Sequence, residues 1–173
     1  MKYANIKYYD VANGPGVRTS LFVSGCTHRC EGCFNEIAWD FDYGREFTKE
    51  TIDEIVDSLR EDYIAGITLL GGEPMEKVNQ LELIKLLREL KKIYPGKTVW
   101  CYTGYTYDED FKQGARAYTE VSDEFLNLVD VLVDGKFIIS LMDIRLKFRG
   151  SSNQRIIDMN QTRKNNEITL WEG

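Results

Sequence analysis

The sequence predicts an α/β fold with a mostly parallel sheet, contained in a single domain that spans residues 1–173. Length is the first observation, because 173 residues form one domain by default. Composition is the second, because a hydrophobic fraction of 43%, with 12% aromatic residues, is enough for a packed core. The third observation is that strand-like and helix-like segments alternate, which is typical of right-handed crossovers between parallel strands.

The first half of the chain contains two predicted strands and one helix. Thr19–Gly25 and Gly66–Gly72 are short runs of β-branched and apolar residues, and each ends in glycine. Between them we expect a helix with Thr48 as its N-cap. Its apolar face is formed by residues at helical spacing: Ile52, Ile55, Val56 and Leu59.

The second half continues this alternation. A second helix ends before Pro95-Gly96 and has one apolar face, formed by Leu83, Leu86, Leu87, Leu90 and Ile93. Two strands follow at Thr98–Gly104 and Val131–Asp134, and a fifth is predicted at Arg155–Asp158. Between the third and fourth strands, Ser122 is expected to cap a short helix that carries Phe125, Leu128 and Val129. Residues 105–118 have no clear pattern, and the polar residues 160–167 are predicted to form a solvated loop.

Polar or glycine-rich residues directly follow each of the first four strands. They are the cysteine-rich segment after Gly25, Gly72-Glu73-Pro74, Thr103-Gly104-Tyr105 and Asp134-Gly135-Lys136. The carboxyl ends of parallel strands meet at one edge of a sheet, and ligands bind at that edge in α/β folds. We therefore expect these four segments to form one site.

Charge and hydropathy exclude several function classes. The chain has 28 acidic and 22 basic residues, so a formal net charge of −6 argues against nucleic acid as a partner. Its apolar runs are short and interrupted by charges, which argues against a membrane span. The first residues lack the apolar stretch of an export signal. These features predict a cytoplasmic protein.

The cysteines indicate a metal or redox site. Cys26, Cys30 and Cys33 lie within eight residues, and His28, the only histidine, lies among them. Without an export signal, clustered cysteines favour metal or redox chemistry over disulfides. Three thiolates fit a 4Fe–4S cluster whose fourth position is filled by Cys101 or left open for a substrate. The spacing lacks the usual ferredoxin pattern, and the paired spacing of zinc sites is also missing. A structural zinc site that adds Cys101 or His28 remains an alternative, as does an electron carrier.

Several strings of residues together resemble a known family. Cys26-x3-Cys30-x2-Cys33 resembles the signature of radical S-adenosylmethionine (SAM) enzymes. The longer string from Gly25 to Asn35, followed by Trp39, is similar to the branch of activating proteins for anaerobic ribonucleotide reductases. The resemblance covers nearly the whole chain. It includes Asn13-Gly14-Pro15-Gly16-Val17-Arg18, Gly71-Gly72-Glu73-Pro74, residues 100–105, residues 131–137 and Arg149-Gly150-Ser151-Ser152-Asn153-Gln154.

The resemblance implies a fold and a set of binding residues. The fold would be an incomplete TIM-like β/α barrel of the radical SAM type, open on one side. Cys26, Cys30 and Cys33 would hold three irons of a 4Fe–4S cluster, and the fourth iron would bind SAM. Phe34 would contact the adenosine, and Lys136 would pair with the methionine carboxylate. The full set of residues implied for SAM binding is Gly32, Cys33, Phe34, Gly71, Gly72, Glu73, Thr103, Asp134 and Lys136.

The resemblance also implies an activity and partners. The enzyme would be an oxidoreductase that cleaves SAM reductively and removes a hydrogen atom from a glycine of the reductase large subunit. Because the cofactor carries this radical chemistry, no catalytic side chain is named. The implied partners are that subunit and an electron donor such as a flavodoxin-like protein. Alternatives are an activase of another glycyl-radical enzyme, of the pyruvate formate-lyase type, a radical enzyme for a small molecule, or a non-enzymatic zinc-binding module.

Overall fold

The computed structural model describes residues 1–173 and contains one open seven-stranded sheet in the order β3-β1-β2-β4-β5-β6-β7. The strands are β1 (Lys2–Asp10), β2 (Val17–Val23), β3 (Arg45–Glu46), β4 (Ile64–Gly71), β5 (Thr98–Tyr102), β6 (Val131–Asp134) and β7 (Arg155–Asp158). Strands β2, β4, β5 and β6 are parallel, whereas β1, β3 and β7 pair antiparallel. The predicted α/β class is confirmed. The expected mostly parallel sheet is correct for the four central strands and wrong for the edges, and the sheet does not close into a barrel.

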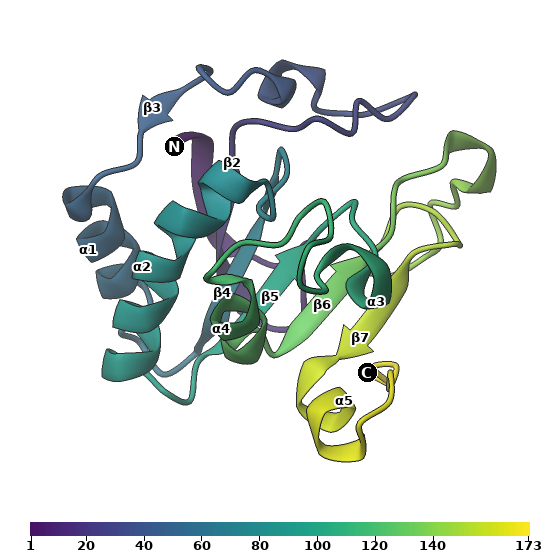
Figure 1. Cartoon of the computed structure of the whole chain (residues 1–173). Helices are drawn as coiled ribbons and strands as arrows, with labels where there is room; N and C mark the ends of the chain where they lie inside the picture. Colours follow the sequence, from purple (N-terminus) through teal and green to yellow (C-terminus); the bar gives the residue numbers. More distant parts are fainter.

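Helices α1, α2 and α4 cover one face of this sheet (Figure 1). The helices are α1 (Lys49–Ser58), α2 (Lys77–Ile93), α3 (Tyr107–Asp110), α4 (Ser122–Leu128) and α5 (Met159–Asn165), with short 3-10 helices at Glu36–Trp39 and Ile139–Leu141. The predicted N-cap of α1 is confirmed, because the Thr48 hydroxyl accepts a hydrogen bond from the backbone N–H of Thr51. No helix combines the length and the apolar character that crossing a membrane requires.

Alternate residues of the strands face opposite sides of the sheet. Cys101 and Leu132 face the helices and belong to the main apolar core. Trp100 and Val133 point the other way, into a smaller apolar cluster. There the ring of Trp171 packs edge-on against Trp100 with a centroid distance of 5.0 Å. The chain after β6 therefore returns to cover the face that the helices leave open.

Three local expectations are wrong, and two strands were missed. Ser122 is the first residue of α4 and not its cap, and its hydroxyl donates to Gln80 Oε1 at 2.6 Å. Ile93 ends α2 and is 47% exposed, so it does not continue the apolar face. The supposed loop at 160–167 is mostly helix α5, which the side chain of Asp158 caps by accepting from the Gln161 N–H at 2.9 Å. Strands β1 and β3 were not expected.

The segments that follow the parallel strands are joined at one edge, as expected. Gly72 N–H donates to the Val23 carbonyl at 2.7 Å, which ties the end of β4 to β2. Glu73 N–H reaches the Gly25 carbonyl at 2.8 Å. On the other side, Gly135 N–H donates to the Tyr105 carbonyl at 2.9 Å. These backbone bonds hold the four segments around a common space.

Candidate functional site

A cavity of about 410 Å³ lies at this edge of the sheet, and all four segments contribute to its wall. This volume lies within the range of small-molecule sites, which is roughly 300–1,000 Å³. Half of the lining residues are hydrophobic, and backbone and polar groups supply the rest. The cysteine segment, the Gly-Gly-Glu turn, Thr103-Gly104 and Gly135 meet here, so the predicted convergence is confirmed.

Three of the four thiols line this cavity. Cys26, Cys30 and Cys33 are half-buried on its wall. Cys101 is fully buried in the apolar core and is not part of the cavity. Burial, supported by the nearby carboxylate of Glu73, raises the pKa of the Cys26 thiol to about 12. Burial also raises the pKa of the Cys30 thiol, whereas Lys136 acts to lower it.

The three thiols supply the donor type of an iron–sulfur cluster. No group of three or more His, Cys, Asp or Glu side chains is close enough together to hold one metal ion. A zinc site needs its ligands to converge on one atom, whereas a 4Fe–4S cluster distributes thiolates over different irons. Three soft thiol donors lie on one cavity wall, and thiolates are the ligands that hold iron–sulfur clusters.

Two buried carboxylates hold the cysteine segment in place. Glu76 Oε1 accepts the backbone N–H and the hydroxyl of Thr27, at 2.7 and 2.5 Å. Glu73 Oε2 lies 2.8 Å from His28 Nε2 and accepts the Gly104 N–H at 2.7 Å. The other oxygen of Glu73 accepts the Met75 N–H. Glu73 is only 1% exposed. Through His28, Gly104 and Met75 its carboxylate connects the cysteine segment, the Thr103-Gly104 segment and its own Gly-Gly-Glu turn.

The glycines of the Gly-Gly-Glu turn have a structural explanation. Gly71 has a φ of +105°, and a Cβ there would lie 2.7 Å from the backbone nitrogen of Val23. A Cβ on Gly72 would lie 2.6 Å from the Gly25 carbonyl oxygen. Close packing of β4 against β2 and its loop therefore requires both glycines. Both glycines also line the cavity, and their expected role in admitting a ligand stays a prediction.

The residues predicted for SAM binding fall into two groups. Those that line the cavity are Cys33, Phe34, Gly71, Gly72, Glu73 and Thr103. Gly32, Asp134 and Lys136 are not among the lining residues. Asp134 is 1% exposed, and its carboxylate accepts from Arg155 Nε at 2.9 Å and from the Tyr107 N–H at 2.8 Å. The structure therefore places Asp134 in an internal ion pair, and Lys136 on the surface near Cys30.

Sequence reasoning assigned no role to several residues of the cavity wall: Asn13, Trp39, Tyr102, Phe137, Phe148, Arg149 and Gln154. Arg149 is the only Lys or Arg on that wall, and its Nη1 donates to the Gln154 carbonyl at 2.5 Å. The indole Nε1 of Trp39 is buried and has no hydrogen-bond partner within the protein. The strings around Asn13 and Arg149 already carried the resemblance, but nothing in their residue types showed that they face the cavity.

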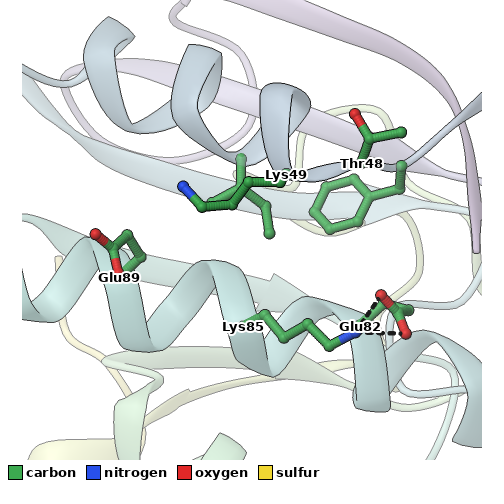
Figure 2. Close-up of a pocket in the computed structure, with 7 residues that line it drawn as sticks. Thr48, Lys49, Glu82, Lys85 and Glu89 are labelled. Atoms are coloured by element: carbon green, nitrogen blue, oxygen red, sulfur yellow. Dashed lines mark hydrogen bonds and ion pairs between the residues drawn. The ribbon is translucent and has the colours of Figure 1, made fainter.

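A second pocket lies far from the thiols. It has a volume of about 290 Å³. Figure 2 shows Thr48, Lys49 and Glu89 around it, between α1 and α2. Lys85 closes one side through an ion pair with Glu82 at 2.8 Å. No cysteine or histidine lines this pocket, so it offers none of the donors expected for an iron–sulfur cluster.

Comparison with known proteins agrees with this site. The family described as "4Fe-4S single cluster domain" matches residues 12–157, which include all four segments. The chain is 41% identical over 156 residues to the anaerobic ribonucleoside-triphosphate reductase-activating protein of Salmonella typhi, covering 89% of this chain and 96% of that protein. The protein of the same name from Enterobacteria phage T4 is 42% identical over 156 residues, or 90% of this chain and 93% of its own length. The chain belongs to the family of anaerobic ribonucleoside-triphosphate reductase-activating proteins.

The family match extends over the whole cavity wall and not only over the cysteine motif. The matched region begins at Ala12 and ends at Ile157, so it contains the cavity wall from the loop before β2 to strand β7. The activating proteins of Escherichia coli and Salmonella typhi match along 96% of their own length. The comparison therefore covers the site as a whole and not the cysteine motif alone.

Proposed function

We propose that this chain is an activase that holds a 4Fe–4S cluster through Cys26, Cys30 and Cys33, binds SAM beside it and generates a glycyl radical on the anaerobic ribonucleoside-triphosphate reductase. Residues 1–173 would act as one radical SAM domain, built as an incomplete β/α barrel. The observation that carries the proposal is the cavity itself. It brings three thiols together with the Gly-Gly-Glu turn and Thr103, and it leaves no fourth cysteine within reach.

The residues of the chain would have three roles: holding the cluster, positioning the cysteine segment and orienting SAM. The three thiols would hold the cluster, which when reduced supplies one electron to cleave the SAM sulfonium into methionine and a 5′-deoxyadenosyl radical. Glu73 and Glu76 keep the cysteine segment in position through His28 and Thr27. Because the carboxylate of Glu73 already accepts three hydrogen bonds, we assign it a positioning role and leave the SAM amino group to backbone carbonyls of the turn.

The remaining residues would orient SAM. Phe34, Phe137 and the ring of Trp39 would provide apolar surface on the wall. Lys136 is close enough to Cys30 to influence its pKa, which suits an ammonium that pairs with the methionine carboxylate at the open iron. Asp134 would act indirectly, because its ion pair with Arg155 fixes the turn that carries Lys136.

The target follows from the relatives. Their common name states that they activate anaerobic ribonucleoside-triphosphate reductase, which favours this reductase over other glycyl-radical enzymes. An open sheet edge suits a substrate that is a loop of another protein, since such a loop must enter the cavity from outside. The electron would come from a flavodoxin-like donor, by analogy.

Release of 5′-deoxyadenosine tests this proposal. The protein is reconstituted anaerobically with iron and sulfide and then mixed with SAM and a strong reductant, and the nucleoside is quantified. We expect release by the wild type and none by Cys30→Ala. Cys101→Ala is the matched control and should release the nucleoside like the wild type. No release from a fully iron-loaded wild type, with the reductase also present, would contradict the proposal.

A further inference from the structure

Exposed apolar side chains concentrate on two segments of the chain. Of the 16 large hydrophobic residues that are exposed, nine lie in residues 34–43 and 138–144. Phe34 and Ile144 are 90% and 93% exposed, which leaves both side chains almost entirely in solvent. Single exposed apolar residues are ordinary on a protein surface, but a contiguous group marks an interaction site.

These two segments meet at the mouth of the cavity. A Cβ on Gly32 would collide with Cδ1 of Ile139, so the cysteine segment packs directly against the second segment. Phe34 lines the cavity and faces solvent at the same time. Figure 1 shows that residues 136–150 extend beyond the end of the sheet, on the side that the cysteine segment also reaches. We refer to residues 136–149 as the arm.

The arm has a defined shape. Its backbone is tied to the residues that follow it: the Asp143 N–H donates to the Gly150 carbonyl at 3.2 Å, and the Ser152 N–H donates to the Leu141 carbonyl at 2.9 Å. Met142 and Ser151 also form an isolated antiparallel bridge. Since these bonds hold the backbone, the exposure of its apolar side chains is a feature of the folded state.

The arm also differs from the rest of the chain in charge. It contains four Lys and Arg residues against one acidic residue, Asp143, which gives a formal net charge of +3. The chain as a whole has a net charge of −6. A basic and apolar projection on an acidic protein favours a partner surface that is apolar at its centre and acidic around it.

We propose that the arm, together with Phe34, is the surface that docks the protein whose glycine is activated, through an apolar patch with an acidic rim on that protein. This inference rests on the proposed function and adds to it where the partner binds. Contact here would place the partner at the mouth of the thiol-lined cavity. A second copy of the chain is a poorer occupant, because a two-fold contact through the arms would bring two like charges together.

The test uses exposed positions that do not line the cavity. Ile144→Glu and Met142→Glu change residues that are 93% and 55% exposed, so both variants are expected to fold. Lys147→Glu tests the charge of the arm, and Val78→Glu, at a 53% exposed position on α2, is the matched control. The dissociation constant for the reductase is measured by sedimentation at low and high salt, and 5′-deoxyadenosine release is measured on each protein alone.

We expect each arm variant to bind the reductase at least about tenfold more weakly, which corresponds to about 1.4 kcal/mol. Release of 5′-deoxyadenosine without the reductase should stay at the wild-type level, and Val78→Glu should bind normally. Salt should weaken wild-type binding more than binding of Lys147→Glu.

Several outcomes would overturn the inference. Normal reductase binding by both Ile144→Glu and Met142→Glu would do so. So would an arm-dependent dimer of this chain, or arm-dependent binding to anionic lipid vesicles, if reductase binding were unchanged. If the iron-loaded wild type releases no 5′-deoxyadenosine even with the reductase present, yet the arm variants lose the reductase, the docking surface stands and the proposed chemistry fails.

Discussion

The two faces of the central strands differ in chemistry, although neighbouring residues of the same strands supply both. On the face under α1, α2 and α4, Leu69 and Cys101 are fully buried among apolar side chains. On the opposite face, Arg18 and Thr68 are also buried, but they form a polar network. Arg18 Nε donates to Thr68 Oγ1 at 2.8 Å, and burial lowers the pKa of the guanidinium to about 10.

This polar network leads to the cavity. Thr68 Oγ1 donates to the Asn13 carbonyl at 2.8 Å, and the side chain of Asn13 donates to Asp10 at 2.6 Å. Asn13 is part of the cavity wall. The helix-covered face therefore stabilises the fold by apolar burial, whereas the opposite face and the carboxyl edge position the segments that surround the site. Substitutions on the helix-covered face should therefore lower stability alone, whereas substitutions on the opposite face or at the carboxyl edge should also impair cluster or SAM binding.

The largest difference is expected between two cysteines. Cys30→Ala should remove a cluster ligand, so iron binding and SAM cleavage should be lost while the far-ultraviolet circular dichroism spectrum is unchanged. Cys101→Ala should keep its iron and lose about 1 kcal/mol of stability, as for an ordinary core substitution. Iron and sulfide analysis of both reconstituted proteins measures their cluster content. Equal iron loss in both variants would contradict the assignment of Cys30 to the site and of Cys101 to the apolar core.

Leu69→Ala tests the helix-covered face. The side chain is fully buried in the main core, and its truncation should lower the free energy of unfolding by roughly 2–5 kcal/mol. Urea unfolding of the apoprotein measures this loss. The iron content per folded molecule should equal that of the wild type, and a selective loss of iron without destabilisation would contradict the account.

Thr68→Val tests the opposite face at the adjacent residue. Valine keeps the shape but leaves Arg18 Nε and the Asn13 carbonyl without their partner. The cost should be about 1–3 kcal/mol of stability. Because Asn13 then loses its support, SAM affinity of the iron-loaded protein should also fall, as measured by equilibrium dialysis. Unchanged affinity would show that the network serves the fold alone.

The smallest effect is expected at Lys136, at the edge of the site. Lys136→Met should weaken SAM binding about tenfold, or about 1.4 kcal/mol, because one charge pair with the carboxylate is lost. Its iron content should be normal, since the thiols are unchanged. Lys147→Met is the matched control for loss of a nearby surface charge. Loss of iron in Lys136→Met would assign this lysine to the cysteine segment instead of to SAM.

Sequence patterns predicted the parts of the fold that depend on local signals. Strand β6 was placed correctly at Val131–Asp134, and Thr48 was placed as the cap of α1, because burial and capping leave clear residue patterns. Strand β1 was missed because most of its residues are exposed or half-buried, so it lacks the continuous apolar run that marked the buried strands. The antiparallel direction of β7 was not predictable from its own four residues, since it depends on the path of the chain after Gly135.

The candidate site shows the same division. The order of strands and motifs predicted that four segments meet, since carboxyl ends share an edge in any parallel sheet. The sequence did not indicate that Asp134 pairs with Arg155, or that Glu73 binds His28 and Gly104, because these contacts depend on side chains from distant segments. Arg149 was missed as a wall residue for the same reason.

Transfer of hydrogen from the reductase tests the central claim most directly. Reductase whose glycines carry deuterium at Cα is incubated anaerobically with the reduced, iron-loaded protein and unlabelled SAM. The 5′-deoxyadenosine formed is then analysed by mass spectrometry. The account predicts deuterium in the nucleoside, in proportion to the glycyl radical seen by electron paramagnetic resonance, and none with Cys30→Ala. Nucleoside without deuterium, from a mixture in which the reductase becomes active, would contradict it.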